Sequence, residues 1–349
     1  MMRKRTDKHM VFWSIGLIFI VLGIFQPVLA QDIHFTQFDR SKIQLNPALT
    51  GNFQGDFRLN GNYRSQWKSV TRPYNTFQFA SDANSILIEG LGVGIAFMQD
   101  AAGDGNLTTS ELSIPLSYRV NIDAQNGSQR TLTLGVQPTF GSVSLDWESL
   151  TFDDQFNGWN FDPSSPTQET PIATSFNYFS ASLGLVFAQY KTRHDHWEIG
   201  YSVHQINQPK WSIYGASDVK VPIRNSAFIA YNTSITEEWK IETGIRFQQQ
   251  NKHSEWLLGA NGVYVLDERY FNYRAIVAGA WVRAEDAGAL FFGFDYNNWR
   301  TGLSYDFNWS ELTTSSNYRG GIEFSVIYIL FNQKGEDLGL PKKYCPDYL

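Results

Sequence analysis

The chain has 349 residues, one cysteine and a formal net charge of −6; aromatic residues make up 15% and charged residues only 18%. This charged fraction is below the ~25% that is usual for soluble domains. A single cysteine excludes an intrachain disulfide and a cysteine-rich metal site. The acidic balance argues against nucleic acid as a partner.

Residues 1–30 are predicted to be a cleaved Sec-type signal peptide. An apolar run covers residues 11–25, and Pro27 followed by Val28-Leu29-Ala30 suits cleavage before Gln31. The alternative is a retained membrane anchor, because the apolar run approaches spanning length. Cleavage would change the net charge from −6 to −9, since it removes Asp7 and four basic residues: Arg3, Lys4, Arg5 and Lys8.

Residues 31–54 have the pattern of neither a long strand nor a long helix. Asn46-Pro47 and Thr50-Gly51 are turn signals. We interpret this stretch as an ordered N-terminal segment that lies in or under the mouth of a barrel. The alternative is a mobile tail, but four apolar residues argue against disorder. These are Phe35, Phe38, Ile43 and Leu45.

Residues 55–331 are dominated by a period of two, which is typical of β-strands. In residues 287–312, two alternating runs flank Asn297-Asn298, which predicts a hairpin. One face of each run is large and aromatic, and the other is small or polar. A transmembrane barrel turns the first face to lipid and the second to its lumen.

We count about fourteen such runs, an even number, as in single-chain outer-membrane barrels. The sequence therefore predicts an all-β antiparallel transmembrane barrel in one domain, and the lack of helical repeats argues against a βαβ fold. Pro115 and Pro138 predict local breaks or bulges, because proline cannot donate a ladder hydrogen bond. The last strand must pair with the first, which predicts a charge pair near that seam between Glu323 and Arg58 or Arg64.

The connections predict an orientation in the membrane. The longest insert, residues 146–175, is expected to be an extracellular loop, because periplasmic turns are short. Residues 332–349, which include Cys345, are expected to form a periplasmic tail. Tryptophans near the ends of several runs are typical of interfacial aromatic girdles.

Two motifs have a weak metal-binding pattern. Residues 100–111 place acidic residues as in a calcium loop, but strand flanks and Ala102 favour a plain hairpin turn. His194-Asp195-His196 could hold a metal but is predicted to be a solvated turn. No phosphate loop or nucleophile motif is present, so we predict no catalytic, cofactor-binding or metal-binding residue. An enzyme would need a reactive serine paired with His34, His204 or His253.

Several short motifs occur in one order along the mature chain. They are residues 31–38 (QDIHFTQF), 45–51 (LNPALTG), 63–67 (YRSQW), 102–105 (AGDG), 150–153 (LTFD), 207–209 (NQP), 302–306 (GLSYD) and 344–346 (YCP). Together they make the chain resemble the PorP/SprF family of type IX secretion and gliding motility. The ending Cys345-Pro346-Asp347-Tyr348-Leu349 departs from the Cys-Pro-Arg-Phe ending of that family.

The resemblance implies a non-enzymatic barrel of the Gram-negative outer membrane. It implies partners among the ring lipoproteins of the secretion system or large surface proteins with a C-terminal sorting domain, besides outer-membrane lipid. The alternative is an outer-membrane porin or a fatty-acid-type transport channel, because a polar lumen suits either function.

Overall fold

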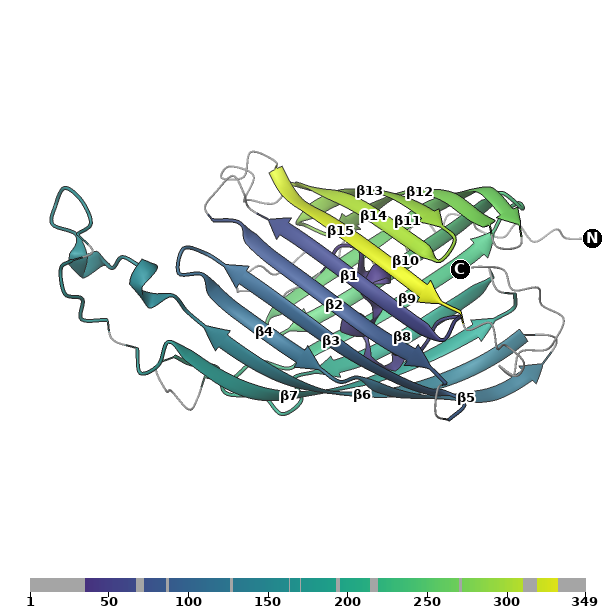
Figure 1. Ribbon diagram of the computed structural model, residues 1–349, viewed down its shortest axis with the longest axis horizontal. Helices are drawn as coiled ribbons and strands as arrows, with labels where there is room; N and C mark the ends of the chain where they lie inside the picture. The colour runs from purple at the N-terminus through teal and green to yellow at the C-terminus, as the bar shows by residue number, and fades with distance from the viewer. Residues whose placement is uncertain are drawn as a thin grey trace, which may run out of the picture. The chain divides into compact units, whose positions relative to one another are not determined.

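The alternating stretches of the sequence form fifteen β-strands in the computed structural model (Figure 1). The structure describes residues 35–66, 72–85, 88–125, 128–162, 164–169, 171–192, 195–213, 219–269, 272–309 and 319–331. Residues 1–30, expected to be a signal peptide, and 332–349, expected to be a periplasmic tail, lie outside these ranges.

The strands follow one another along the chain in a meander. They are β1 (Phe57–Gln66), β2 (Tyr74–Asn84), β3 (Leu91–Ala102), β4 (Leu107–Ser113), β5 (Leu116–Gln125), β6 (Ser128–Ser144), β7 (Ser175–Tyr190), β8 (His196–His204), β9 (Arg224–Ser234), β10 (Trp239–Gln250), β11 (His253–Arg269), β12 (Asn272–Arg283), β13 (Ala287–Tyr296), β14 (Trp299–Asn308) and β15 (Arg319–Leu330).

The sheet closes on itself, because β15 pairs antiparallel with β1 from Phe57 opposite Leu330 to Ser65 opposite Ile322. Strands β4 and β5 both pair with β3 and with β6 in one continuous register, so they occupy a single place in the wall. The wall therefore has fourteen strand positions, which confirms the predicted barrel.

The break between β4 and β5 falls at Pro115, as predicted. The prediction for Pro138 differs from the structure, since β6 runs through this residue and keeps its register with β7. The register sets Ile114 and Pro115 opposite Pro138 and Gln137, so both prolines lie at the same place in the wall. The Pro115 carbonyl still accepts a hydrogen bond from Gly94, and the Pro138 carbonyl accepts one from Ile114. Of the two strands, only the one that contains Pro115 is interrupted.

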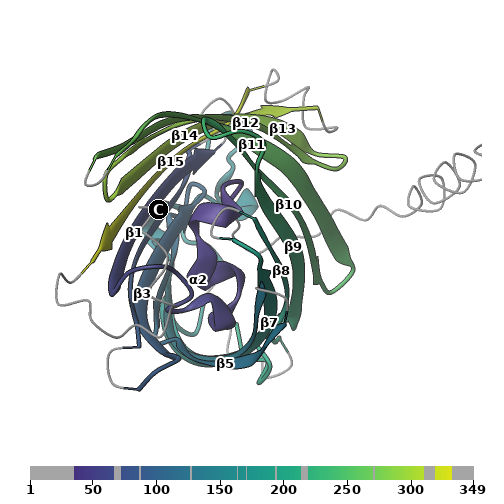
Figure 2. The ribbon, with the colours of Figure 1, turned by 90° about the vertical axis from the view of Figure 1, so that its right-hand side faces the viewer.

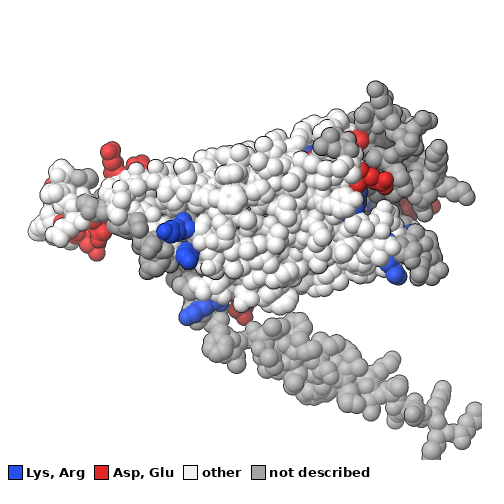
Figure 3. Space-filling view, turned by 90° about the horizontal axis from the view of Figure 1, so that it is seen from below, with Lys and Arg blue, Asp and Glu red and all other residues white. Residues whose placement is uncertain are grey.

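The two faces of the wall differ as the period of two predicts. On β13 the outward Leu290 and Phe292 are 58% and 59% exposed, whereas the inward Phe291 and Asp295 are 4% exposed. The outer surface in Figure 3 is almost free of charged side chains over the strands, and charges gather at the two ends. An apolar belt between charged ends suits a lipid bilayer. Among the described helices, none has the length and apolar character required to cross a membrane.

The connections at the two ends of the barrel differ in length. Five of the connections at the end that holds Phe57 and Leu330 are short: residues 126–127, 191–195, 235–238, 270–271 and 297–298. The opposite end carries the longest ones, residues 145–174, 205–223 and 309–318. We call these the turn end and the loop end.

The N-terminal segment lies inside the barrel rather than outside it. Viewed along the barrel, its short helices occupy the lumen and are surrounded by strands (Figure 2). Phe35, Phe38, Ala48 and Leu49 are each at most 3% exposed, although they precede the first strand. We call residues 35–52 the plug.

Candidate functional site in the lumen

Three short helices make up the plug: η1 (Phe38–Arg40), α2 (Lys42–Leu45) and η2 (Pro47–Leu49). Asn46 begins η2, because its side-chain oxygen accepts the N–H of Ala48 at 2.8 Å and Pro47 supplies a helical φ. The turn signals of the sequence thus divide the plug into compact pieces that fit within the lumen.

The first residues of the plug are anchored near the loop end by carboxylates. The two oxygens of Glu323 on β15 accept the backbone N–H groups of Thr36 and Gln37, each at 2.9 Å. Thr36 also donates its hydroxyl to Asp306 of β14 at 3.1 Å and accepts from Arg283 of β12 at 2.8 Å. All of these side chains are buried.

These anchors belong to a wider network of charges on the lumen wall. Arg283 lies 3.5 Å from Glu255 and 3.4 Å from Asp306. Arg246 forms an ion pair with Glu255 and donates to the Phe35 carbonyl at 3.3 Å. A buried charge is stable only when paired, so the network constrains every group that it contains.

Glu323 and Arg64, which were predicted to pair at the barrel seam, are neighbours there, but the ion pair that Arg64 forms is with Asp306. The register places Arg64 directly opposite Glu323, and both are 1% exposed. The Arg64 guanidinium pairs with Asp306 at 2.9 Å. Arg58, the other candidate, pairs with Asp82 of β2 at 2.7 Å.

The middle of the plug packs against aromatic side chains of the wall. Phe38 meets Trp281 edge to face, with ring centroids 5.2 Å apart, and the Trp281 indole donates to Asn261 at 2.9 Å. Arg40 lies over the Phe291 ring at 4.9 Å. Such contacts add to the apolar burial that holds the plug.

The last residues of the plug are held by close approach of backbones. Gly135 of the wall faces Pro47 and Ala48, and Gly184 faces Asn46 and Ala48. A Cβ on Gly135 would clash with Pro47 and Ala48, lying 2.6 Å from the Ala48 Cα. Ser117 donates to the Thr50 carbonyl at 2.6 Å, and Asp82 accepts the Gly51 N–H at 2.7 Å.

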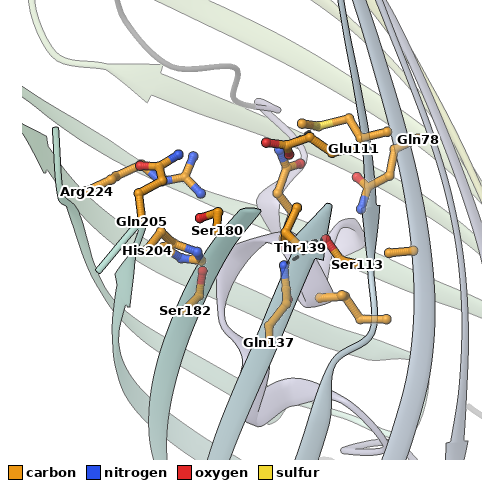
Figure 4. A pocket seen from close by; sticks show the side chains of 14 residues that line it. Gln78, Glu111, Ser113, Gln137, Thr139, Ser180, Ser182, His204, Gln205 and Arg224 are labelled. Atoms are coloured by element: carbon orange, nitrogen blue, oxygen red, sulfur yellow. Dashed lines mark hydrogen bonds between the residues drawn. The ribbon is translucent and has the colours of Figure 1, made fainter. Parts of the chain in front are cut away.

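A polar pocket remains beside the plug, and its space of about 550 Å³ includes open solvent. Figure 4 shows side chains from several strands pointing into it. Most of its lining is polar: Gln44, Gln78, Glu111, Ser113, Gln137, Thr139, Ser180, Ser182, His204, Gln205 and Arg224. Such a lining offers a hydrocarbon ligand little apolar surface to contact.

The weak motifs of the sequence have structural explanations. Asp100 and Glu111 lie on β3 and β4, where they accept hydrogen bonds from Thr76 at 2.6 Å and Tyr178 at 2.5 Å. His196 stacks on Tyr190, with ring centroids 5.1 Å apart. His34 and His194 lie outside the described residues. Within the described ranges, no three His, Cys, Asp or Glu side chains are grouped as metal ligands would be.

His204 and His253, the other two histidines that an enzyme would need, lie in the wall. The His204 Nε2 is 3.1 Å from the Ser202 hydroxyl, which donates to the Leu45 carbonyl of the plug at 2.9 Å. Ser202 therefore positions the plug. His253 begins β11 at the loop end.

A closed fourteen-position β-barrel with an apolar outer belt and a polar, plugged lumen defines an outer-membrane type of barrel. The fold is similar to the Ralstonia pickettii toluene transporter TbuX, with a TM-score of 0.51 and 10% identity over 84% of this chain and 94% of that one. The Pseudomonas putida toluene transporter TodX aligns at a TM-score of 0.45 and 11% identity, over 82% and 93%. At these identities the likeness to TbuX indicates the fold alone.

The family model of the type IX secretion system membrane protein PorP/SprF matches residues 28–328. The chain therefore belongs to the PorP/SprF family, as the ordered sequence motifs predicted. It is a non-enzymatic membrane protein of the type IX secretion system. No curated protein matches the chain.

The contacts of the plug with the wall were not predictable from sequence. The available signal was four apolar residues in a short segment rich in turn residues. That signal, with the barrel, suggested an ordered segment in or under the barrel mouth, but it could not name the wall groups, because these come from strands up to 288 positions away along the chain.

Proposed function

We propose that this protein is an outer-membrane barrel closed by its own N-terminal segment. In this role it serves type IX secretion as an accessory or anchoring component that aids the export or surface attachment of proteins with a C-terminal sorting domain. The proposal includes export by a cleaved signal peptide, residues 1–30. It places residues 332–349 in the periplasm and the loop end outside the cell.

The observation that supports this role best is the plug. Its residues bond to strands on all sides of the lumen, which supports a pore that the plug closes. The bonded strands are β1, β2, β5, β7, β8, β10, β11, β12, β14 and β15. Closure suits a component that binds other proteins and must keep the membrane sealed.

The rival function is a diffusion or transport channel, which the fold likeness to a toluene transporter would favour. A polar pocket lined by amides, hydroxyls and charges is unsuited to an apolar solute. The two functions differ in one measurable property, since a channel conducts and a sealed barrel does not.

Conductance in a planar lipid bilayer tests the closure. The purified protein should show no steady conductance, and a variant that lacks residues 35–52 should conduct because the wall closes through β1 and β15 without the plug. A steady pore in the intact protein would identify a porin instead.

Affinity purification from outer membranes in mild detergent tests the secretion role. Ring lipoproteins of the envelope or a large surface protein should co-purify and be identified by mass spectrometry. Recovery of the barrel alone, together with ion conductance, would contradict the proposal.

A further inference from the structure

The connection between β6 and β7, residues 145–174, projects from the loop end of the barrel (Figure 1). We call it the acidic arm. We propose that this arm is a docking element for a partner protein whose surface is basic and has an apolar pocket for Trp159. The inference concerns a surface outside the lumen, so it does not depend on whether the plug closes the pore.

The backbone at the tip of the arm is held in a defined turn around Trp159. Asn157 organises the turn, because its side-chain oxygen accepts the N–H groups of Trp159 at 3.0 Å and Asn160 at 3.1 Å. The Asn157 amide also donates to the Asn160 side chain at 2.8 Å. Gly158, at φ +95, permits the tight turn.

The other aromatic residues of the arm pack against one another. The Phe156 and Phe161 rings pack 5.0 Å apart across the turn, and Trp147 packs on Phe152 at 4.8 Å. Trp159, in contrast, is 95% exposed. An exposed tryptophan on an ordered turn suits an interface hot spot, since little backbone freedom is lost when it is buried.

The charge of the arm selects the chemistry of the partner. The arm contains six acidic residues and no lysine or arginine. They are Asp146, Glu148, Asp153, Asp154, Asp162 and Glu169. Figure 3 shows carboxylates gathered over this part of the molecule. A uniformly negative surface attracts a positive one and repels anionic lipid headgroups, which favours a basic protein surface over a membrane.

The arm is also fixed at its root. Leu145 donates to the Thr174 carbonyl and Asp146 to the Gly105 carbonyl, both at 2.8 Å. On the neighbouring connection, Trp211 packs edge to face on Phe176, with ring centroids 5.8 Å apart. Farther out, Gln155 donates to the Ser165 carbonyl at 2.8 Å. These bonds pre-organise the arm for binding.

Site-specific photo-crosslinking in intact outer membranes tests the inference. The probe is p-benzoylphenylalanine in place of Trp159, and the crosslinked residues of the partner are mapped by mass spectrometry. We expect the crosslinks to fall on one lysine- and arginine-rich surface of one protein and to weaken at high salt. The same probe in place of Ile235, which is exposed at the turn end, is the control and should not reach that surface.

Charge and shape variants complete the test with the protein so identified. Asp153→Asn together with Asp154→Asn should lower the crosslink yield. Trp159→Ala should weaken binding of the purified partner by about 30-fold, as for a hot-spot residue. Trp159→Phe should retain part of the binding affinity. Crosslinks to lipid, to a second copy of this chain or to acidic surfaces would overturn the inference. So would a lack of crosslinks. Conductance of the Trp159→Ala variant should match that of the unaltered protein, which separates this inference from the proposed function.

Discussion

The two ends of the plug are held in different ways. Residues 35–40 are held near the loop end by buried charged side chains. Glu323 accepts the Thr36 backbone N–H, Asp306 accepts the Thr36 hydroxyl, and Arg283 donates to that hydroxyl. Residues 46–51 are held near the turn end mainly by wall glycines that let backbones meet and by hydrogen bonds such as that from Ser117. One buried ion pair also contributes there, because Asp82 accepts the Gly51 N–H and Arg58 donates to the Leu49 carbonyl.

This difference suggests which end of the plug can be released. The ionic end can be weakened by a change that neutralises or displaces one group, because each buried charge depends on the others. The glycine end depends on close packing, which tolerates no added volume. We therefore expect the ionic end to be the place where a partner or a local change of charge would release the plug.

Replacing Glu323 by alanine should have the largest effect. The substitution removes both oxygens that accept the Thr36 and Gln37 N–H groups. Hydrogen bonds to a charged group contribute about 1.5–3 kcal/mol each, so the free energy of plug seating should fall by about 3 kcal/mol. Trypsin cleavage at Arg40 or Lys42, which lie within the plug, should accelerate on the order of 100-fold.

The matched control is Glu323→Gln, which keeps one side-chain oxygen as an acceptor and removes the charge. Its cleavage rate should lie between those of the unaltered protein and Glu323→Ala. Equal cleavage rates for all three proteins would show that the ionic anchor does not hold the plug.

Gly135→Ala should have the next largest effect, at the other end of the plug. The new Cβ would clash with the backbone of Pro47 and Ala48, so η2 must move. Overpacking of this kind costs about 1–3 kcal/mol. The measurement is thermal unfolding in detergent, together with the tryptic cleavage rate.

Gly262→Ala is the control for added volume on a strand. A Cβ at this position meets no atom closer than 3.8 Å, so stability should change by less than about 0.5 kcal/mol. If both glycine variants melt at the same temperature, close packing at the turn end is not what holds the plug.

Asn46→Ala should have a smaller effect. It removes the cap on the Ala48 N–H and the bond from Asn46 to the Tyr201 carbonyl at 3.1 Å. Loss of a helix cap costs about 1 kcal/mol, so cleavage at Arg40 should accelerate several-fold. Asn46→Ser keeps a capping oxygen and separates the cap from the bond to the wall. A serine variant as labile as the alanine variant would place the effect in the wall bond.

Asp39→Asn should have the smallest effect and a dependence on pH. Burial raises the pKa of the Asp39 carboxyl above its usual value, although the neighbouring Arg40 opposes the shift. The charged form of Asp39 is thus disfavoured in the folded protein. This unfavourable contribution to folding stability is fully present above the raised pKa and absent below the ordinary pKa near 3.9. The variant should therefore melt slightly higher than the unaltered protein at neutral pH and equally at acid pH. A lower melting temperature at neutral pH would contradict this.

Much of the wall follows from local pattern, because a period of two separates a lipid face from a lumen face on each strand independently. Leu290 and Asp295 show this on β13. The site is different, since Glu323 has no local signal that it will bind the backbone of Thr36. The uninterrupted course of β6 through Pro138 was likewise unpredictable, because it depends on what the neighbouring strand places opposite.

The sequence by itself determined that the chain forms a membrane-type barrel of about fourteen strands, and the ordered motifs determined its family. Only the tertiary structure decided that residues 35–52 fill the lumen and that Glu323 and Gly135 receive them. The physical reason is that alternation is read within one strand, whereas a plug contact needs groups that barrel closure brings together from distant parts of the chain.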